Sequence, residues 1–228
     1  MEKGICHVAQ IPVRGDAKSS AEMVTQLIYG ETYTIVDQND NWYKIRMDYD
    51  GYEGWLSDSS IFPFVDRDTY VQKGLYSSEK NDIDKGTVLS SMGSELPRVG
   101  LNAQLLQVAQ LAKQFLGTPY LWGGRHFSGI DCSGFVQIVY KVLGVKLPRD
   151  ASQQQKIGKP VAFDNLFEGD LVFFHKNERI GHVGLALGNG KIIHSHGMVR
   201  IDELTKEGIF NADSGLQTHY YHSAKRLR

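Results

Sequence analysis

One cysteine stands where a loop gives way to a helix, in the stretch Gly129-Ile130-Asp131-Cys132-Ser133-Gly134-Phe135. Residues 135–144 carry apolar side chains at helical spacing, and Gly144 is of the type that commonly ends a helix. Cys132 is thereby placed in the first helical turn, where unpaired N–H groups and the helix dipole stabilise a thiolate. We expect a lowered pKa and a nucleophilic sulfur. A buried, inert cysteine on a core helix is the alternative.

A cysteine nucleophile needs a nearby base, and that base needs an orienting partner. The sequence holds eight histidines. Four of them fall in predicted strands, namely His175, His182, His194 and His196. The other four fall in loop or terminal contexts, where exposure to solvent is expected, namely His7, His126, His219 and His222.

His182 and His194 lie on consecutive predicted strands, 182–187 and 191–196. Because side chains alternate between the faces of a strand, a two-residue turn at Asn189-Gly190 would put the two imidazoles on opposite faces. A loop of odd length would put them on one face, and a five-residue loop directly opposite each other. A Cys132–His182–His194 triad therefore predicts an odd loop. A clean two-residue turn would favour His175 or His196 instead.

The elements that must position these side chains fall into two groups. Residues 1–65 hold about five short runs of alternating β-branched and aromatic residues separated by turn residues, which predicts a small barrel. From residue 102 the apolar spacing becomes helical, and three apolar strands follow at 170–175, 182–187 and 191–196. The chain is therefore predicted to be α+β, with helices packed on an antiparallel sheet after the barrel.

We divide the chain into a first domain at residues 1–65, a connector at 66–100 with an extra strand near 87–92, and a second domain at 101–228. Of the 228 residues 41% are hydrophobic and 22% charged, as in ordinary globular proteins. The net charge of −1 argues against a nucleic-acid partner, and two distant cysteines argue against a disulfide or a zinc site. Since no apolar run has the length of a signal peptide or a membrane span, we expect a cytoplasmic protein that does not bind membranes.

Separated motifs in the second half resemble, in order and spacing, the NlpC-type cell-wall peptidases, which are cysteine peptidases with a papain-like core. The resemblance covers about residues 102–225. The motifs are Thr118-Pro119-Tyr120-Leu121-Trp122-Gly123-Gly124, Asp131-Cys132-Ser133-Gly134-Phe135, Leu147-Pro148-Arg149-Asp150, Gly169-Asp170-Leu171-Val172-Phe173-Phe174, His182-Val183-Gly184 and Ile193-His194.

The first domain resembles bacterial SH3-like domains. Its most specific motif is Gly51-Tyr52-Glu53-Gly54-Trp55-Leu56, preceded by runs at 26–31 and 41–45. The combination of the two domains is similar to the YkfC-like γ-D-glutamyl-L-diamino acid endopeptidases. This resemblance implies Cys132 as the nucleophile, His182 as the base and His194 as the residue that orients His182.

The resemblance also implies a set of substrate-binding residues. Tyr120 and Trp122 would line the site, and Asp131 and Ser133 would contact the peptide. The remaining position, Asp150, would meet the ammonium group of an N-terminal L-Ala. A buried ammonium needs a carboxylate partner, which supports that role independently. A helix N-cap is the alternative role for Asp150.

Three further residues complete the predicted pocket. Tyr52 of the first domain would close the pocket beyond the L-Ala, and Glu22 is a second acid considered there. The resemblance is loose after Asp150, where Ala151 leaves Ser152 as the nearest hydroxyl.

The implied reaction is hydrolysis of the bond between γ-D-Glu and a diamino acid, L-Lys or meso-diaminopimelate, in murein peptides with a free N-terminal L-Ala. We expect a monomer that takes part in cell-wall recycling and needs no metal and no organic cofactor. Two alternatives stay open. The first is an amidase or acyltransferase on the same core, and the second is a non-catalytic peptidoglycan-binding protein.

Overall fold

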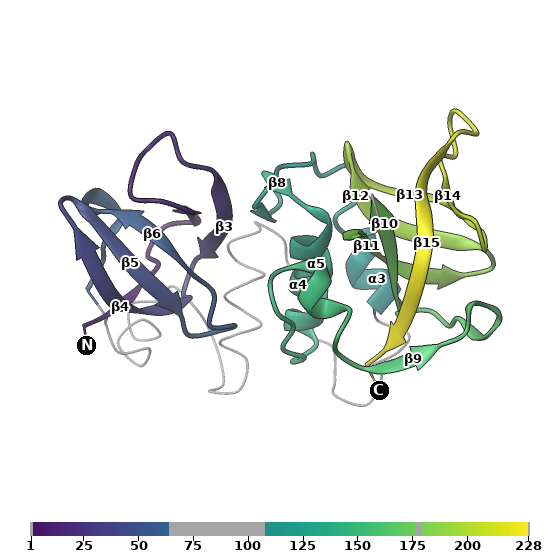
Figure 1. Ribbon diagram of the computed structural model, residues 1–228, viewed down its shortest axis with the longest axis horizontal. Helices are drawn as coiled ribbons and strands as arrows, with labels where there is room; N and C mark the ends of the chain where they lie inside the picture. Colours follow the sequence, from purple (N-terminus) through teal and green to yellow (C-terminus); the bar gives the residue numbers. More distant parts are fainter. Residues whose placement is uncertain (1, 64–107, 177–178, 228) are drawn as a thin grey trace. The chain divides into compact units, whose positions relative to one another are not determined.

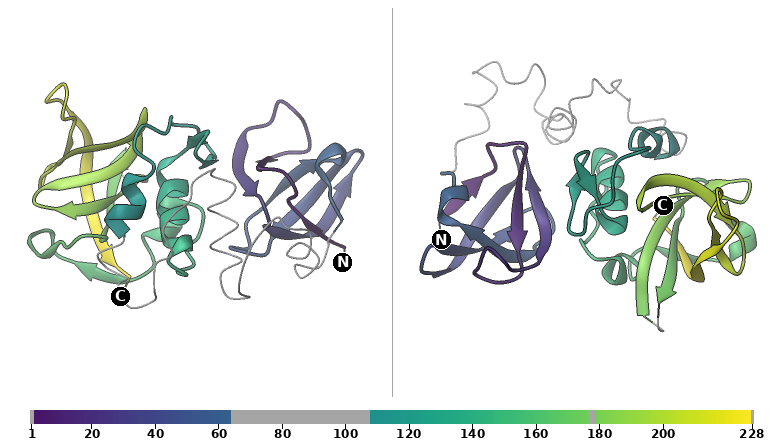
Figure 2. Two further views of the ribbon diagram at one scale, coloured as in Figure 1. Left: turned by 180° about the vertical axis from the view of Figure 1, so that it is seen from behind. Right: turned by 90° about the horizontal axis from the view of Figure 1, so that it is seen from above.

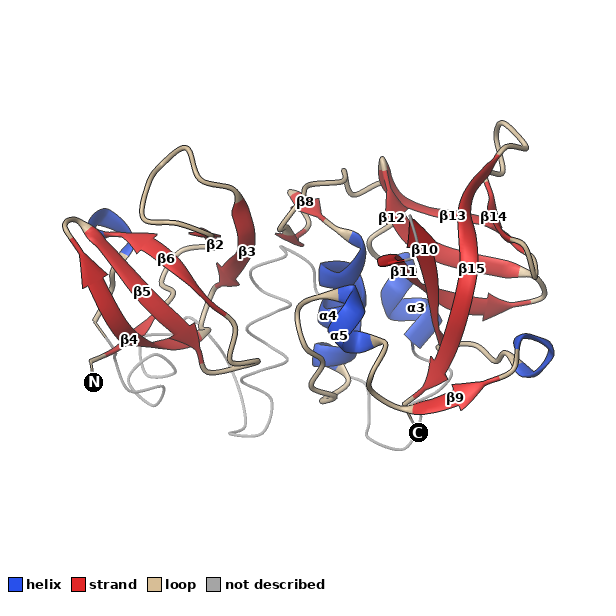
Figure 3. Cartoon of the chain, in the orientation of Figure 1, coloured by secondary structure: helices blue, strands red, loops and turns tan. Residues whose placement is uncertain are grey.

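The computed structural model describes residues 2–63, 108–176 and 179–227 (Figures 1 and 3). The chain forms two compact units, one of residues 1–97 with 122–126 and the other of residues 98–121 with 127–228. The predicted domain boundaries near 65 and 100, the extra strand near 87–92 and the first turns of the helix expected from 102 lie outside the described residues.

The first unit is an antiparallel sheet of six strands in the order β1-β4-β5-β6-β2-β3, which curls around its own core (Figure 2). This confirms the all-β prediction. Its elements are β1 (Lys3–Ile5), β2 (Gln10–Arg14), β3 (Met23–Ile28), β4 (Thr32–Asn39), β5 (Trp42–Met47), β6 (Glu53–Ser57) and η1 (Asp58–Ser60). Side chains on alternating positions fill the core, namely Ile11, Val13, Leu27, Tyr33, Ile45, Met47 and Leu56.

A distant piece of sequence, residues 122–126, completes the first unit. Within it Arg125 is 1% exposed, and its guanidinium donates to both carboxylate oxygens of Glu31 at 2.8 and 2.9 Å. The same guanidinium donates to the carbonyl oxygen of Gln26, and the Arg125 N–H donates to the Gln26 side chain, both at 2.7 Å. Gly123 runs so close to β3 that a Cβ there would lie 2.4 Å from the carbonyl oxygen of Met23. Only glycine, which has no Cβ, fits a backbone approach this close.

The second unit combines short helices with an antiparallel sheet, as predicted. Its helical elements are α3 (Val108–Lys113), α4 (Cys132–Val142), α5 (Ala151–Gln154) and η2 (Phe163–Asn165). Its strands are β8 (Gly129–Ile130), β9 (Lys159–Val161), β10 (Leu171–Lys176), β11 (Arg179–Gly188), β12 (Lys191–His196), β13 (Met198–Leu204), β14 (Gly208–Phe210) and β15 (Gln217–Arg226). The short strand β7 (Arg125–His126) belongs to the segment that completes the first unit.

The large sheet closes on itself, because β10 pairs with β15 as well as with β11. The three predicted strands correspond to β10, β11 and β12. The strands β9, β13, β14 and β15 were not predicted, and two of them carry residues of the site described below.

Helix α4 lies against β11 and β12 and next to α3 (Figure 1). Asp131 caps its N-terminus, since one carboxylate oxygen accepts from the Gly134 N–H at 2.7 Å. At the other end Gly144 has φ +75°, and the Gly144 and Val145 N–H groups donate back to Lys141 and Tyr140 at 2.9 Å, a Schellman motif. The predicted helix start and end are confirmed. Among the described residues no helix is both long and apolar enough to cross a membrane.

The connection between β11 and β12 differs from the prediction of an odd loop. Gly188 pairs with Lys191, so Asn189-Gly190 forms a two-residue turn, with φ +50° and +66° as a type I′ turn requires. The prediction of loop length is therefore wrong. A register shift at Leu187 nevertheless inserts one extra residue into β11, so that Gly184, not Leu185, pairs with His194. This bulge restores His182 and His194 to the same face of the sheet.

Candidate active site

Cys132 is the first residue of α4 and is 7% exposed. Its sulfur is hydrogen-bonded by the backbone of Val183, the residue after His182, which ties the thiol to β11. Burial raises the pKa of the Cys132 thiol to about 12, and the negative charge of Asp131 acts in the same direction. The expected lowering of this pKa is therefore wrong for the resting protein, because desolvation by the whole unit outweighs the local helix terminus. The thiol is neutral until a base takes its proton.

This raised pKa predicts how the thiol reacts with an alkylating agent. In a Cys6→Ala background we expect the alkylation rate of Cys132 by iodoacetamide to rise about tenfold per pH unit up to pH 10, because only the thiolate reacts. An ordinary cysteine would level off above its pKa of about 8.5. Peptide mapping by mass spectrometry after timed quenching measures the rate. A plateau below pH 9, or a fast pH-independent reaction near pH 6, would show a stabilised thiolate instead.

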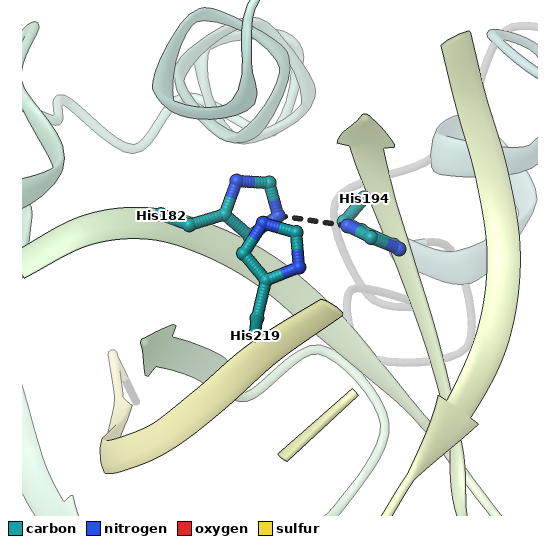
Figure 4. Close-up of side chains that lie close together, drawn as sticks. All are labelled: His182, His194 and His219. Atoms are coloured by element: carbon teal, nitrogen blue, oxygen red, sulfur yellow. Dashed lines mark hydrogen bonds between the residues drawn. The ribbon is translucent and has the colours of Figure 1, made fainter. Parts of the chain in front are cut away.

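The two predicted catalytic histidines meet in a buried hydrogen bond. His182 Nε2 lies 2.7 Å from His194 Nδ1, and His194 Nε2 lies 2.9 Å from the Oδ2 atom of Asp202 (Figure 4 shows the two histidines). The exposed fractions of His182, His194 and Asp202 are 6%, 0% and 0%. Since β12 lies between β11 and β13, His194 does not line a sheet edge. The result is a buried chain of three hydrogen-bonded polar side chains, His182, His194 and Asp202.

Asp202 fixes which nitrogen of each ring carries the proton. Burial raises the pKa of its carboxyl, but hydrogen bonds from His194, the Ala212 N–H and Arg200 outweigh this and lower that pKa below its usual range. An ionised carboxylate only accepts, so His194 must donate from Nε2 and accept at Nδ1. His182 must then donate from Nε2. The lone pair of His182 is left on Nδ1, the nitrogen that can act as a base toward the thiol.

Both imidazoles are neutral at pH 7. Burial lowers the pKa of His182 well below its usual value, and the neighbouring histidines His219, His194 and His196 add to this. Burial also lowers the pKa of His194, although Asp202 opposes it. Neutral thiol and neutral base fit a reaction in which the proton moves from sulfur to nitrogen as the nucleophile attacks.

His219 was expected at the surface, and that expectation is wrong. It lies on β15, and its ring stacks on that of His182 with centroids 4.0 Å apart and planes inclined by 24° (Figure 4). Asp202 and His219 were both missed because β13 and β15 were missed. The signal for Asp202 was its place in the alternating run Met198–Leu204, where it shares a face with Arg200 and Leu204.

Asp131 and Ser133 form a buried network under the start of α4. Arg149 donates to the Asp131 carboxylate at 3.0 and 2.5 Å and to the Ser133 hydroxyl at 2.9 Å. Asp131 also caps the helix, so both of its carboxylate oxygens accept hydrogen bonds that hold the first turn of α4, where Cys132 lies. Arg149 is 2% exposed and was not predicted as a site residue. Contact of Asp131 and Ser133 with a peptide stays a prediction.

Three other predicted binding residues are more exposed than Asp131 and Ser133, namely Tyr120, Asp150 and Ser152. Asp150 occupies the N-cap position of α5, but its side chain makes no capping hydrogen bond, which argues against the capping role. Ser152 is exposed on the same short helix. Tyr120 is half-buried, and burial, with the charges of Cys132 and Asp131, raises the pKa of its phenol, which therefore stays a hydrogen-bond donor.

The other three predicted binding residues belong to the first unit. Trp122 is 59% exposed in the segment 122–126, Tyr52 packs against the first unit's core, and Glu22 is exposed just before β3. Their role in substrate binding stays a prediction.

Comparisons with known proteins cover both units. The model of the NlpC/P60 family matches residues 117–216, and that of the bacterial dipeptidyl-peptidase SH3 domain matches residues 13–61. A gamma-D-glutamyl-L-lysine dipeptidyl-peptidase of Bacillus subtilis (strain 168) is 31% identical over 211 residues, covering 75% of this chain and 71% of the relative. Its namesake from Bacillus cereus (strain ATCC 10987 / NRS 248) is 28% identical over 228 residues, covering 76% and 67%.

A solved structure agrees in fold. The crystal structure of an NlpC/P60 family protein from Bacillus cereus ATCC 10987 matches 99% of both chains with a TM-score of 0.72 at 20% identity. The SH3-like barrel and the papain-like second domain are both confirmed. With a cysteine at a helix start, a histidine pair on the facing sheet and these matches, the chain belongs to the NlpC/P60 family of cysteine peptidases.

Proposed function

We propose that this protein hydrolyses the bond between γ-D-Glu and a diamino acid, L-Lys or meso-diaminopimelate, in murein peptides that begin with a free L-Ala. Two observations together carry the chemistry. His182, His194 and Asp202 form a buried relay, and Cys132, at the first position of α4, is hydrogen-bonded to the backbone of Val183, the residue after His182. The two relatives that are gamma-D-glutamyl-L-lysine dipeptidyl-peptidases support the substrate class.

The reaction we propose is acyl transfer in two steps. As the Cys132 sulfur attacks the γ-carbonyl of D-Glu, its proton moves to His182 Nδ1, and His182 then passes this proton to the departing amine of the diamino acid. Water loses a proton to His182 and attacks the thioester, which releases the Cys132 thiol and the dipeptide. The Cys132 N–H, with the phenol of Tyr120, would stabilise the oxyanion.

The requirement for a free L-Ala rests on Asp150. Its carboxylate is not used as a helix cap and would pair with the substrate ammonium. An amidated L-Ala, as in intact wall, has no such charge, so the site would select peptides already released from the wall. We propose that it acts on these as a monomer in the cytoplasm, during wall recycling. Cell fractionation and size-exclusion chromatography with light scattering test these two points.

The decisive experiment compares L-Ala-γ-D-Glu-L-Lys with its N-acetyl derivative. We expect kcat/KM for the acetylated peptide to be at least about 100-fold lower, because that peptide has no ammonium group to pair with the Asp150 carboxylate. Asp150→Asn should lower the rate on the free peptide and reduce this discrimination, because a neutral amide cannot pair with the substrate ammonium. Liquid chromatography with mass spectrometry identifies the products.

Equal rates on the two peptides would remove Asp150 from the substrate site. An uncut tripeptide, with cleavage only of substrates in which a sugar is linked to L-Ala, would identify an amidase.

A further inference from the structure

The geometry points to a second property of the relay: we propose that His182, His194 and His219 together bind a zinc ion, and that zinc bound there blocks the catalytic base. The inhibitory consequence rests on the proposed function, whereas zinc binding itself does not. We refer to these three residues as the histidine cluster.

The cluster has the donor atoms and spacing that zinc needs. One ring nitrogen from each histidine lies within 4.8 Å of the other two, and the His182–His194 pair is 2.7 Å apart. Zinc binds imidazole nitrogens at about 2.0–2.1 Å in tetrahedral sites, which separates the nitrogens by about 3.4 Å. Small ring rotations therefore bring the three nitrogens around one ion. Figure 4 shows the three side chains converging from separate strands, β11, β12 and β15.

The groups behind the ligands suit a metal site. A zinc-binding histidine usually donates its other N–H to a carboxylate or another oxygen, which fixes its orientation. His194 makes this contact with Asp202 at 2.9 Å. His219 Nδ1 lies 2.9 Å from the Thr218 hydroxyl, which itself donates to the Ile209 carbonyl, so Nε2 of His219 is the nitrogen that carries the lone pair.

A zinc ion can also reach the histidine cluster from the solvent. His219 is only partly buried, so an ion can reach the cluster from the solvent side of β15. A zinc ion with three imidazole ligands keeps a fourth position for water. His196, whose ring centroid is 4.8 Å from that of His219, lies outside the cluster and is exposed.

Coordination would change the protonation of the base without net release of a proton. In the relay His182 carries its proton on Nε2, and zinc needs the lone pair of that same atom. The proton therefore moves to Nδ1 of His182, and His182 stays neutral overall. Nδ1 is the nitrogen that must accept the Cys132 proton, so zinc-bound His182 cannot act as a base. A loss of activity follows directly.

Direct binding of zinc is measured with the Cys132→Ala variant, which lacks the competing thiol. Calorimetric titration with zinc chloride in a non-coordinating buffer should show one ion per chain. Adding His219→Phe keeps a planar ring on His182 but removes the nitrogen, and we expect the affinity to fall at least tenfold. His222→Phe, an exposed histidine on the same strand, is the matched control and should bind zinc as the parent does.

Inhibition is measured with the tripeptide and an intact Cys132. Zinc should inhibit hydrolysis reversibly, with activity restored by EDTA, and His219→Phe should raise the inhibitory concentration by the same factor as it weakens binding. Thr218→Val, which removes only the hydroxyl that orients His219, should shift both values in the same direction and provides the test if His219→Phe does not fold.

Two results would overturn the inference. One is equal zinc affinity in His219→Phe, Thr218→Val and His222→Phe. The other is loss of zinc binding in Cys132→Ala, which would make the sulfur the essential ligand. If the tripeptide is not cleaved at all, the proposed function fails while the calorimetric test of the cluster still stands.

Discussion

Cys132→Ala is expected to release no dipeptide from L-Ala-γ-D-Glu-L-Lys. Alanine removes the only atom that can form the thioester, and it leaves the helix start intact because alanine is the best helix former. Loss of a nucleophile lowers turnover by about 10⁶-fold in a well-studied hydrolase, and we expect an effect of that order. Product release measured by mass spectrometry over hours sets the detection limit.

The other cysteine of the chain is the control. Cys6 is fully buried in the first unit, and burial raises the pKa of its thiol to about 12. Cys6→Ala removes a thiol of similar pKa that lies in the other unit, so hydrolysis should continue. Turnover by Cys132→Ala at more than a thousandth of the parent rate would end the assignment of Cys132 as nucleophile.

The second large effect is expected from Asp202→Asn. In the parent, Oδ1 of Asp202 accepts from the Ala212 N–H at 2.9 Å and from Arg200 Nε at 3.0 Å, while Oδ2 lies 2.9 Å from both His194 Nε2 and Arg200 Nε. The amide oxygen of asparagine will occupy the Oδ1 position, because the backbone N–H there cannot turn away. The amide NH₂ then points at His194 and donates to it.

This reverses the proton pattern of the relay. His194 must now accept at Nε2 and donate from Nδ1, so His182 accepts at Nε2 and carries its proton on Nδ1. His182 is then protonated on Nδ1, the nitrogen that accepts the thiol proton in the proposed reaction. The equivalent change in a serine peptidase lowers kcat by about 10⁴-fold, and because Asp202 acts here through one more ring we expect about 10³-fold in kcat with little change in KM.

Asp213→Asn is the matched control, since Asp213 is the other carboxylate bound by Arg200 and its side chain is 79% exposed. It should leave kcat unchanged. Nitrogen-15 NMR of the imidazoles should show His194 protonated on Nε2 in the parent and on Nδ1 in Asp202→Asn. An active Asp202→Asn enzyme with the parent tautomer would show that Asp202 does not act through the proton pattern.

The parts of this site that sequence could predict are those whose signals are local. Cys132 at a helix start, Gly144 at the helix end and the apolar runs of β10 to β12 each follow from neighbouring residues. The bulge at Leu187 could not be predicted, because no particular residue type is required for an extra residue in a strand. Yet this bulge decides which face His182 presents.

Other features depend on how distant strands pack. β15 is half-exposed along most of its length, so it shows no clean alternation, and His219 looked like a surface residue. Asp202 sits among charged neighbours in Met198–Leu204 and becomes a buried carboxylate only when β12 and β14 flank it. The raised pKa of Cys132 could not be predicted either. Desolvation of the thiol depends on the whole fold, and its effect outweighs that of the helix terminus.

The ion pair between Arg125 and Glu31 limits how the barrel can be transferred to another protein by gene recombination. The barrel's innermost cation comes from sequence that lies beyond the connector, only seven residues before Cys132 (132 − 125). Cutting the gene at the connector would therefore remove the guanidinium that neutralises the buried Glu31 carboxylate, and breaking a buried pair costs about 3–5 kcal/mol. The barrel therefore cannot be exchanged between proteins by recombination at the connector without losing this ion pair. The barrel keeps its buried ion pair only when residues 122–126 accompany it.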